Sequence, residues 1–503
     1  MENILNTSLK SYENCVKCGK CLPVCPSYNF NFNEFFSPRG RIRLIASEIK
    51  DELPLKISKF EKSMSTCLLC GRCADICPNG VKTGPLVIEE KFKLNKLKTD
   101  KFSIDNFALK ALKGNSKFLF SAGLRFLNIL KFNNLNIPKS SGKPFILHKD
   151  LEFSTKNNIT KNNLEDYYKN ISPKKKSPSI NEESSVKEVK ENDANYNYTH
   201  INNQITSAKP QIIEEKEFNL SYISKNNLIK AGYFSGCIFN NIYPEISKST
   251  VSALNKNNIS VFVPSSQSCC GLPHISSGDI NSFKELAINN ALSFKNKKLD
   301  YIITSCASCS FSINKLYPLY FSAEEKNEAK EKDRLEILNF SKKLIDIWNF
   351  FNILKKKGLP IKQGRVYNQL DAVFHIPCHL KNSADFLPFS KNEQLIGEAG
   401  SIVDYIKGLN LKPLKHNYCC GNGGMFNVRH YSMSKEITKR KFREIKEAIQ
   451  ETAKNKETSS RSQIILTSCS GCILSLKDQK NILKNDKKIP VKHLIEIYDK
   501  SIK

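Results

Sequence analysis

The sequence lacks the long apolar runs that membrane-spanning helices require, because no stretch of about 18 uninterrupted apolar residues occurs. Its first ten residues contain no basic segment followed by an apolar one, so we expect no secretory signal peptide. No G-x-G-x-x-G motif follows a predicted strand, which argues against a dinucleotide site. We therefore expect no FAD or NAD on this chain, and the lack of an aromatic-plus-basic motif predicts no nucleic-acid binding.

Charge and cysteine content are both unusual. Lys and Arg outnumber Asp and Glu by 78 to 49, but Lys is spread through all regions, as in a biased composition rather than a binding surface. Eighteen cysteines in 503 residues do not fit a short disulfide scaffold, so we expect metal-bound thiolates in a reducing cytoplasm. Residues 118–132, interrupted by Arg125 and Lys131, predict a helix packed on its own protein or one lying on the inner face of the cytoplasmic membrane.

Two cysteine runs near the N-terminus share the spacing C-x2-C-x2-C-x3-C-P. This spacing wraps three thiolates around one face of an iron–sulfur cube, and in two-cluster ferredoxins the fourth cysteine of each run ligates the other cube. Two zinc sites are the disfavoured alternative, because structural zinc takes four ligands from spaced pairs. We assign Cys15, Cys18, Cys21 and Cys77 to one [4Fe-4S] cluster, and Cys67, Cys70, Cys73 and Cys25 to the other.

The segment between the two runs predicts helices rather than the hairpins of a minimal ferredoxin. Ser37 is a suitable N-cap and Pro38 a suitable first residue for a helix that ends near Lys50. Residues 56–66 predict a second helix leading into the second run. We therefore expect a mostly helical two-cluster domain at residues 1–100. Its arginines either offset cluster charge or form a solvated helix face, with neither alternative favoured: Arg39, Arg41 and Arg43.

Composition changes after this domain. Residues 101–148 predict a helical connector. Residues 149–225 are rich in Asn, Lys, Ser and Glu, contain no cysteine and predict a disordered linker.

The remainder of the chain contains an internal repeat, with one copy at residues 226–360 and the other at 361–503. Each copy has a single cysteine, then a Cys-Cys-Gly triplet, then a C-x2-C pair, in the same order. Such a match is hard to obtain by accident. The candidate metal ligands are Cys237, Cys269, Cys270, Cys306 and Cys309 in the first copy, and Cys378, Cys419, Cys420, Cys469 and Cys472 in the second.

Short apolar runs alternate with amphipathic stretches in each copy. In the first, residues 231–235, 259–263 and 301–304 predict strands, and residues 243–255 and 281–295 predict helices. This alternation is typical of a parallel α/β sheet, with the cysteines just beyond the strand ends, where such sheets bind ligands. The expected fold class is therefore α+β multidomain: a helical two-cluster domain followed by two α/β cysteine-rich domains.

Five cysteines per copy are compatible with three kinds of site. Adjacent cysteines seldom reach one ion together, which favours an iron–sulfur centre with several irons. Zinc bound by four of the five cysteines, and a redox-active disulfide, remain alternatives. Nearby histidines could transfer protons or replace a ligand, but packing or hydrogen bonding around the ligands is favoured for His274, His375, His379 and His416.

The repeat resembles the cysteine-rich CCG domain of heterodisulfide reductase, where such five-cysteine motifs hold a noncubane iron–sulfur cluster. The whole plan resembles the iron–sulfur subunits of glycolate oxidase, of lactate oxidation systems and of anaerobic glycerol-3-phosphate dehydrogenase. The residues Ser37-Pro38-Arg39-Gly40-Arg41 are similar to those of the glycolate oxidase subunit. The resemblance implies two [4Fe-4S] clusters and, since both motifs are complete, one or two noncubane clusters.

The same resemblance implies an electron conduit rather than the site of substrate oxidation. A separate FAD-dependent hydroxy-acid dehydrogenase, acting on glycolate or lactate, would supply electrons, and a quinone or another membrane acceptor would receive them. One alternative is a disulfide-reducing subunit like heterodisulfide reductase, and another is a zinc-containing docking module without redox function.

Overall fold

The computed structural model describes residues 12–50, 52, 57–97, 151–153, 229–323, 327–382, 403–412, 414–453, 462–482 and 489–502. All eighteen cysteines are among them, and none is paired in a disulfide there. The predicted connector at residues 101–148, including residues 118–132, lies outside the described residues, as does all of the predicted linker except residues 151–153. Within the described part of the chain, no helix is long and apolar enough to cross a membrane.

The N-terminal region is helical, as predicted. Helix α3 begins where expected, because the Ser37 side chain accepts a hydrogen bond from the Gly40 N–H and Pro38 is the first helical residue. Apolar side chains of α3, α4 and α6 form a small core, on which Cys15, Cys67 and Cys77 pack. The elements are α2 (Tyr28–Asn31), the 3-10 helix η2 (Glu34–Phe36), α3 (Pro38–Ile49), α4 (Ile57–Ser65), α5 (Arg72–Asp75) and α6 (Thr83–Leu97).

The first copy of the repeat contains a five-stranded sheet in the order β1-β3-β2-β4-β5. Strands β2 to β5 are parallel, as expected for this fold class, whereas β1 pairs antiparallel with β3. Strand β1 corrects one sequence-based expectation, because its residues fall in the segment predicted as a disordered linker. A three-residue strand of alternating character gives too short a pattern to detect. The strands are β1 (Leu151–Phe153), β2 (Lys230–Tyr233), β3 (Ser260–Val263), β4 (Tyr301–Thr304) and β5 (Leu344–Asp346).

Helices connect these strands, and the predicted ones match within about two residues. They are α10 (Gly236–Asn241), α11 (Pro244–Lys256), α12 (Leu272–Ser276), α13 (Ile280–Phe294), α14 (Ala307–Phe311), the π-helix η3 (Ser312–Leu316), α15 (Tyr317–Tyr320), α16 (Glu328–Lys343) and α17 (Ile347–Lys356).

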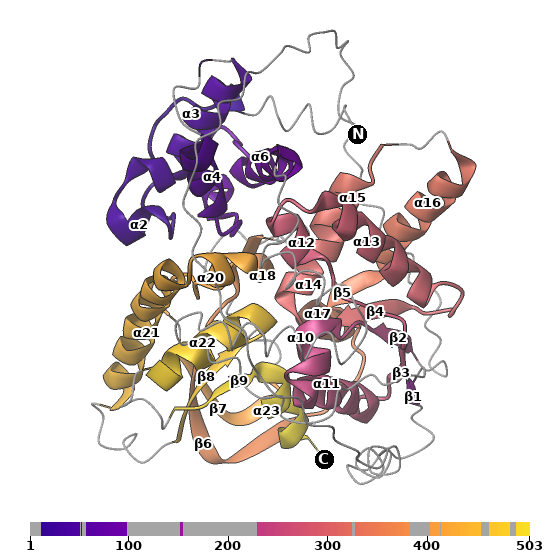
Figure 1. Ribbon diagram of the computed structural model, residues 1–503. Helices are drawn as coiled ribbons and strands as arrows, with labels where there is room; N and C mark the ends of the chain where they lie inside the picture. The colour runs from indigo at the N-terminus through magenta and orange to yellow at the C-terminus, as the bar shows by residue number, and fades with distance from the viewer. Residues whose placement is uncertain are drawn as a thin grey trace, which may run out of the picture. The chain divides into compact units, whose positions relative to one another are not determined.

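The second copy contains a parallel sheet in the order β7-β6-β8-β9. Figure 1 shows this sheet with α21 and α22 beside it. The elements are β6 (Gly364–Phe374), α18 (Cys378–Asn382), β7 (Ile406–Lys412), α20 (Met425–Arg429), α21 (Tyr431–Ala453), β8 (Ser462–Thr467), α22 (Ser470–Ile482), β9 (Val491–His493) and α23 (Leu494–Ser501).

The two sheets have the same topology once β1 is set aside, since β3-β2-β4-β5 corresponds to β7-β6-β8-β9. A matched hydrogen bond fixes the alignment. The Phe234 N–H donates to the Ile303 carbonyl at 2.8 Å, and the His375 N–H donates to the Leu466 carbonyl at 2.8 Å. The internal repeat read from the cysteines is therefore a repeat of the fold, and corresponding residues of the two copies can be compared directly.

Candidate cluster sites

The first candidate site lies in the N-terminal region. Cys15, Cys18, Cys21 and Cys77 line one pocket, together with Cys73. Cys77 comes from the second run, so the structure brings together the four cysteines that the sequence assigned to one cluster. Cys18 is exposed, which leaves this site open to a partner.

The second candidate site combines the other four cysteines. Burial raises the pKa of Cys70 to about 12, and the thiols of Cys25 and Cys67 contribute to the shift. Burial also raises the pKa of Cys73, with contributions from Cys70, Cys67 and Cys25. Cys25, from the first run, thus lies near the cysteines of the second run. Ligation of a cluster by these cysteines remains a prediction.

The two runs share a backbone feature that their spacing does not reveal. The residue before the second cysteine of each run, Lys17 or Leu69, has a positive φ, of 58° and 53° respectively. Non-glycine residues rarely adopt this conformation, and such strain concentrates at functional sites. The same strained turn in both runs indicates that both loops are shaped for the same task.

The three arginines of α3 have different environments, so neither alternative from the sequence applies to all of them. Arg43 is exposed, as a solvated helix face would have it. Arg39 donates through Nη1 to the Lys17 carbonyl at 2.9 Å, inside the first run. Arg41 is 1% exposed, and it donates to the Ser63 carbonyl at 2.9 Å and to Ser27 Oγ at 3.1 Å. Arg41 therefore connects the chain after the first run to the helix before the second.

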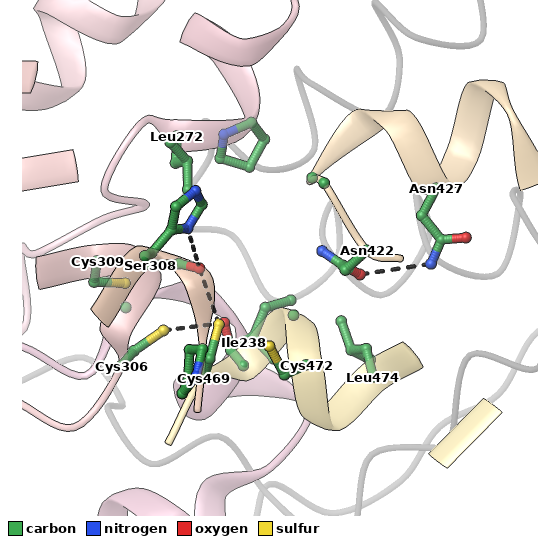
Figure 2. Close-up of a pocket in the computed structure, with 18 of the residues that line it drawn as sticks. Ile238, Leu272, Cys306, Ser308, Cys309, Asn422, Asn427, Cys469, Cys472 and Leu474 are labelled. Carbon is green, nitrogen blue, oxygen red and sulfur yellow. Dashed lines mark hydrogen bonds between the residues drawn. The ribbon is translucent and has the colours of Figure 1, made fainter. Parts of the chain in front are cut away.

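In the repeat, the cysteines of both copies line one shared cavity of about 200 Å³. It exceeds the ~150 Å³ cavity that holds a benzene ring, and so has room for more than a single ion. Figure 2 shows cysteines of the first copy and of the second on the walls of this pocket. The sequence predicted two separate five-cysteine sites, and nothing in the spacing indicated that they would converge. The cysteines are Cys237, Cys269, Cys270, Cys306 and Cys309 from the first copy, and Cys378, Cys419, Cys420, Cys469 and Cys472 from the second.

Sheet topology explains why the cysteines gather. Cys306 follows β4 and Cys469 follows β8, so each stands at the carboxyl end of a parallel strand, as predicted. The glycine after each adjacent pair is required by the backbone, since Gly271 and Gly421 have φ of 79° and 82°. A Cβ on Gly271 would also lie 2.6 Å from the Phe283 ring. The triplet is thus a sharp turn that directs both cysteines.

The C-x2-C loops of the two copies meet directly. The Ala307 N–H donates to the Ser468 carbonyl at 3.0 Å. Cys306 Sγ lies 3.1 Å from Ser470 Oγ, and Ser308 Oγ lies 3.0 Å from Cys469 Sγ (Figure 2). Each loop therefore contacts a cysteine or serine of the other copy.

The thiols influence one another strongly. In the first copy, hydrogen bonds between neighbouring thiols, together with burial, raise the pKa of Cys269, Cys270 and Cys309. In the second copy, hydrogen bonds from Cys419 and Cys472 lower the pKa of Cys420. Several thiolates can share so buried a place only if positive charge lies beside them. A bound metal supplies that charge, and a thiol that coordinates it is deprotonated outright. The donor set therefore fits a metal centre in each copy, and thiolates are the ligands that iron–sulfur clusters use.

The four candidate histidines differ in what they contact. His274 Nδ1 lies 3.0 Å from Asp279 Oδ2, and His379 Nδ1 lies 3.0 Å from Ser308 Oγ. His416 stacks on Tyr418, with ring centroids 5.1 Å apart. His375 differs from these three, because its ring nitrogen and the sulfurs of Cys420 and Cys472 lie within 4.8 Å of one another.

The second cysteine run adjoins the second copy. Leu68 and Cys70 line the shared cavity, and Leu68 packs in one apolar cluster with Cys419. Arg72 Nη1 donates to the Asn417 carbonyl at 3.2 Å. The first copy is contacted elsewhere, by Lys91 of α6, which donates to the Ser276 carbonyl at 2.9 Å. The predicted second cluster is thus next to the second copy's cysteines.

Two family models match the chain. A 4Fe-4S dicluster domain matches residues 11–81, and the CCG cysteine-rich domain matches residues 231–314 and 372–477. The matches agree with the helical region and the two sheet-containing copies. The chain thus contains a 4Fe-4S dicluster domain followed by paired CCG domains.

Curated relatives align with this chain at low identity. A probable glycolate oxidase iron-sulfur subunit of Bacillus subtilis is 25% identical over 469 residues, covering 92% of this chain and 88% of the relative. An uncharacterized iron-sulfur protein of Methanococcus maripaludis is 22% identical over 501 residues, covering 98% and 74%. Lactate utilization protein A of a Geobacillus species is 26% identical over 274 residues, covering 54% and 98%.

Proposed function

Because the chain joins a 4Fe-4S dicluster domain to two CCG domains, we propose that it is the electron-transfer subunit of a flavin-linked 2-hydroxy-acid oxidoreductase. A partner flavoprotein oxidises glycolate or lactate, and this chain passes the electrons on towards a quinone. The names of the relatives from Bacillus subtilis and Geobacillus support the substrate class. The observation that carries the proposal is that the second cysteine run contributes to both pockets, with Cys73 in the one that contains exposed Cys18 and Cys70 in the shared cavity.

The contacts suggest an order for electron transfer. Electrons enter at the site of Cys15, Cys18 and Cys21, which is the more exposed of the two N-terminal sites. They continue to the site of Cys67, Cys70 and Cys73, and then to the second CCG copy, whose Cys419 shares an apolar cluster with Leu68. The first copy follows, across the contact between the two C-x2-C loops.

The chain's own residues prepare this route for single electrons. Iron–sulfur clusters, when bound, supply one-electron acceptors whose potentials depend on hydrogen bonds to sulfur and on solvent exposure. Several cysteines of the shared cavity are buried, since Cys270, Cys306, Cys420 and Cys469 are each 4% exposed or less. Burial of this kind also fixes the ligand positions before a cluster binds.

The metal content tests the basis of the proposal. We expect the anaerobically purified full-length chain to contain iron and acid-labile sulfide in both the N-terminal region and the CCG domains. Replacing Cys270 or Cys420 with Ser is expected to reduce both counts, with the N-terminal clusters intact. Stoichiometric zinc without additional sulfide would instead identify the CCG domains as a docking module.

The substrate class is tested by co-purification. We expect the tagged chain, isolated anaerobically from its source, to retain an FAD-containing dehydrogenase. Adding glycolate or lactate to that complex should bleach the visible absorbance of the clusters, and a quinone should restore it. A complex that no 2-hydroxy acid reduces would contradict the proposal, even with all clusters present.

A second candidate function is disulfide reduction. The observation favouring it is that cysteines of both copies face one cavity, where a disulfide could meet two centres at once. The reaction would take two electrons and two protons and release two thiols. Thiol production from added organic disulfides by the dithionite-reduced chain would support this candidate, and its absence during quinone reduction would support the first.

A further inference from the structure

Two ring nitrogens of the second copy, Nε2 of His375 and Nε2 of His379, have no ordinary hydrogen-bonding partner, but among the described residues only His375 also belongs to a compact group of potential metal ligands. His375 is 2% exposed, and its Nε2 contacts no nitrogen or oxygen acceptor or donor. A ring nitrogen of His375 lies within 4.8 Å of the sulfurs of Cys420 and Cys472. Because Nδ1 contacts the Asn417 amide, we infer that Nε2 is the nitrogen that faces these thiols. A buried polar atom without such a partner is costly, so its orientation needs an explanation.

Neighbouring groups determine which ring nitrogen carries the hydrogen. The Asn417 amide is oriented by two contacts: Nδ2 donates to the Ile376 carbonyl at 2.9 Å, and Oδ1 accepts from Lys441 Nζ at 3.0 Å. Its Oδ1 also lies 3.2 Å from His375 Nδ1. Because Oδ1 can only accept, Nδ1 must be the protonated nitrogen. In the neutral ring, the lone pair of Nε2 therefore points at the thiols.

The surroundings hold this ring in place. Its acceptor, Asn417 Oδ1, is fixed by Lys441. Lys441 is itself held at 3.0 Å by Glu444 Oε2, and Glu444 accepts from the backbone N–H groups of Asn417 and Tyr418. A histidine whose second nitrogen donates to an oriented acceptor is the usual arrangement of a metal ligand.

The first copy has a different side chain at the corresponding place. Phe234 and His375 both stand three residues before the first cysteine of their copy, and both make the same backbone hydrogen bond to the neighbouring strand. The Phe234 ring packs against Phe294 and Phe340. Gln267, at the position of Asn417, donates to the Tyr233 carbonyl at 3.0 Å and accepts from the Ser235 N–H at 2.9 Å, so its amide is used by residues on either side of Phe234.

From this geometry we propose that His375 is a nitrogen ligand of the metal centre of the second CCG copy, bound through Nε2 beside Cys420 and Cys472. Phe234 excludes such a ligand from the matching place in the first copy. The two centres therefore differ in their ligand atoms, one having sulfur and nitrogen donors. The inference rests on the proposed function only in requiring that the second copy binds an iron–sulfur centre.

The test is pulsed electron paramagnetic resonance on the full-length chain, prepared with natural histidine and with [15N]histidine. A centre that transfers single electrons has an odd number of electrons in either its oxidised or its reduced form. Redox titration therefore brings it to a paramagnetic state. We expect a directly bound nitrogen coupling that changes from 14N to 15N with the label. Labelled protein in which no centre couples to histidine nitrogen would overturn the proposal.

Two variants locate the coupling. His375→Phe gives the second copy the side chain of the first and should abolish the coupling, whereas His416→Phe, the same change at an exposed position of the loop after β7, should preserve it. Persistence of the coupling in His375→Phe would refute the assignment. Iron and sulfide analysis of the unsubstituted protein separates the two proposals. Zinc in the second copy would contradict the proposed function. An iron centre that shows no histidine coupling would contradict only the nitrogen ligand.

Discussion

The two CCG copies hold their cysteines on the same strand order but surround them with different side chains. In the first, Asn290 of α13 holds the loop before the adjacent pair, accepting from the Ser268 N–H at 2.8 Å and donating to the Cys269 carbonyl at 2.9 Å. In the second, Glu444 of α21 holds the loop before the adjacent pair, and Lys441 is its buried ion-pair partner. Ligand positions thus follow from topology, whereas the polarity around them is set separately in each copy.

This difference predicts unequal roles in electron transfer. Cys420→Ser should nearly abolish transfer to the quinone and should also leave the first copy oxidised when the flavoprotein supplies electrons, because the second copy adjoins the N-terminal sites. Cys270→Ser should block the quinone but leave reduction of the second copy intact. Paramagnetic resonance after adding substrate measures both, with dithionite as the control that reduces every centre. Equal effects of the two variants on the remaining CCG centre would contradict the order.

Substituting the side chains that hold the two cysteine loops should lower the free energy of unfolding by different amounts. Lys441→Met leaves Glu444 charged and 4% exposed without its partner, a change that typically costs about 3–5 kcal/mol. Asn290→Ala leaves neutral backbone groups unsatisfied in the first copy, at about 1–3 kcal/mol. Anaerobic urea unfolding of the full chain measures both free energies. A Lys441→Met, Glu444→Gln double variant should recover part of the loss, and a larger loss for Asn290→Ala would refute the comparison.

Sequence reasoning predicted those features that depend on local pattern. The capped helix at Ser37, the strand at residues 301–304 and the cysteines beyond the strand ends were all predictable, because periodicity, capping residues and spacing are local. The convergence of both cysteine sets on one cavity was not, since it depends on how α14 and α22 pack. The buried position of Arg41 and the distinct orientation of His375 also depend on partners distant in sequence.

Strand β1 gives a smaller test, because it is the one strand of the first sheet without a counterpart in the second among the described residues. Deleting residues 160–210, which leaves β1 in place, should change neither iron content nor unfolding free energy. Deleting residues 149–210 also removes β1 and should destabilise the first copy while leaving iron content unchanged. Loss of iron in the shorter deletion would show that the segment supports a cluster site.

The smallest expected effect concerns the caps of α17 and α23, where Asp346 and His493 occupy corresponding places. Thr304 pairs with Asp346 in the first sheet, and Thr467 pairs with His493 in the second. Asp346 Oδ1 accepts from the Trp348 N–H at 3.0 Å, and His493 Nδ1 accepts from the Ile495 N–H at 3.1 Å. Burial raises the pKa of Asp346 to about 7 and lowers the pKa of His493.

These shifts oppose each other as pH changes. Between its unfolded pKa of 3.8 and about 7, Asp346 keeps its proton only in the folded state, so its contribution to stability falls as pH rises. Below its unfolded pKa of 6.5, His493 is protonated only in the unfolded state, so its contribution falls as pH drops. Asp346→Asn and His493→Asn keep capping side chains but remove one titration each. Relative to the unsubstituted chain, the unfolding free energy between about pH 5.5 and 7 should then rise with pH in Asp346→Asn and fall with pH in His493→Asn, by up to about 1.4 kcal/mol per pH unit. Parallel pH profiles for the two variants would show that the two caps do not titrate as their burial requires.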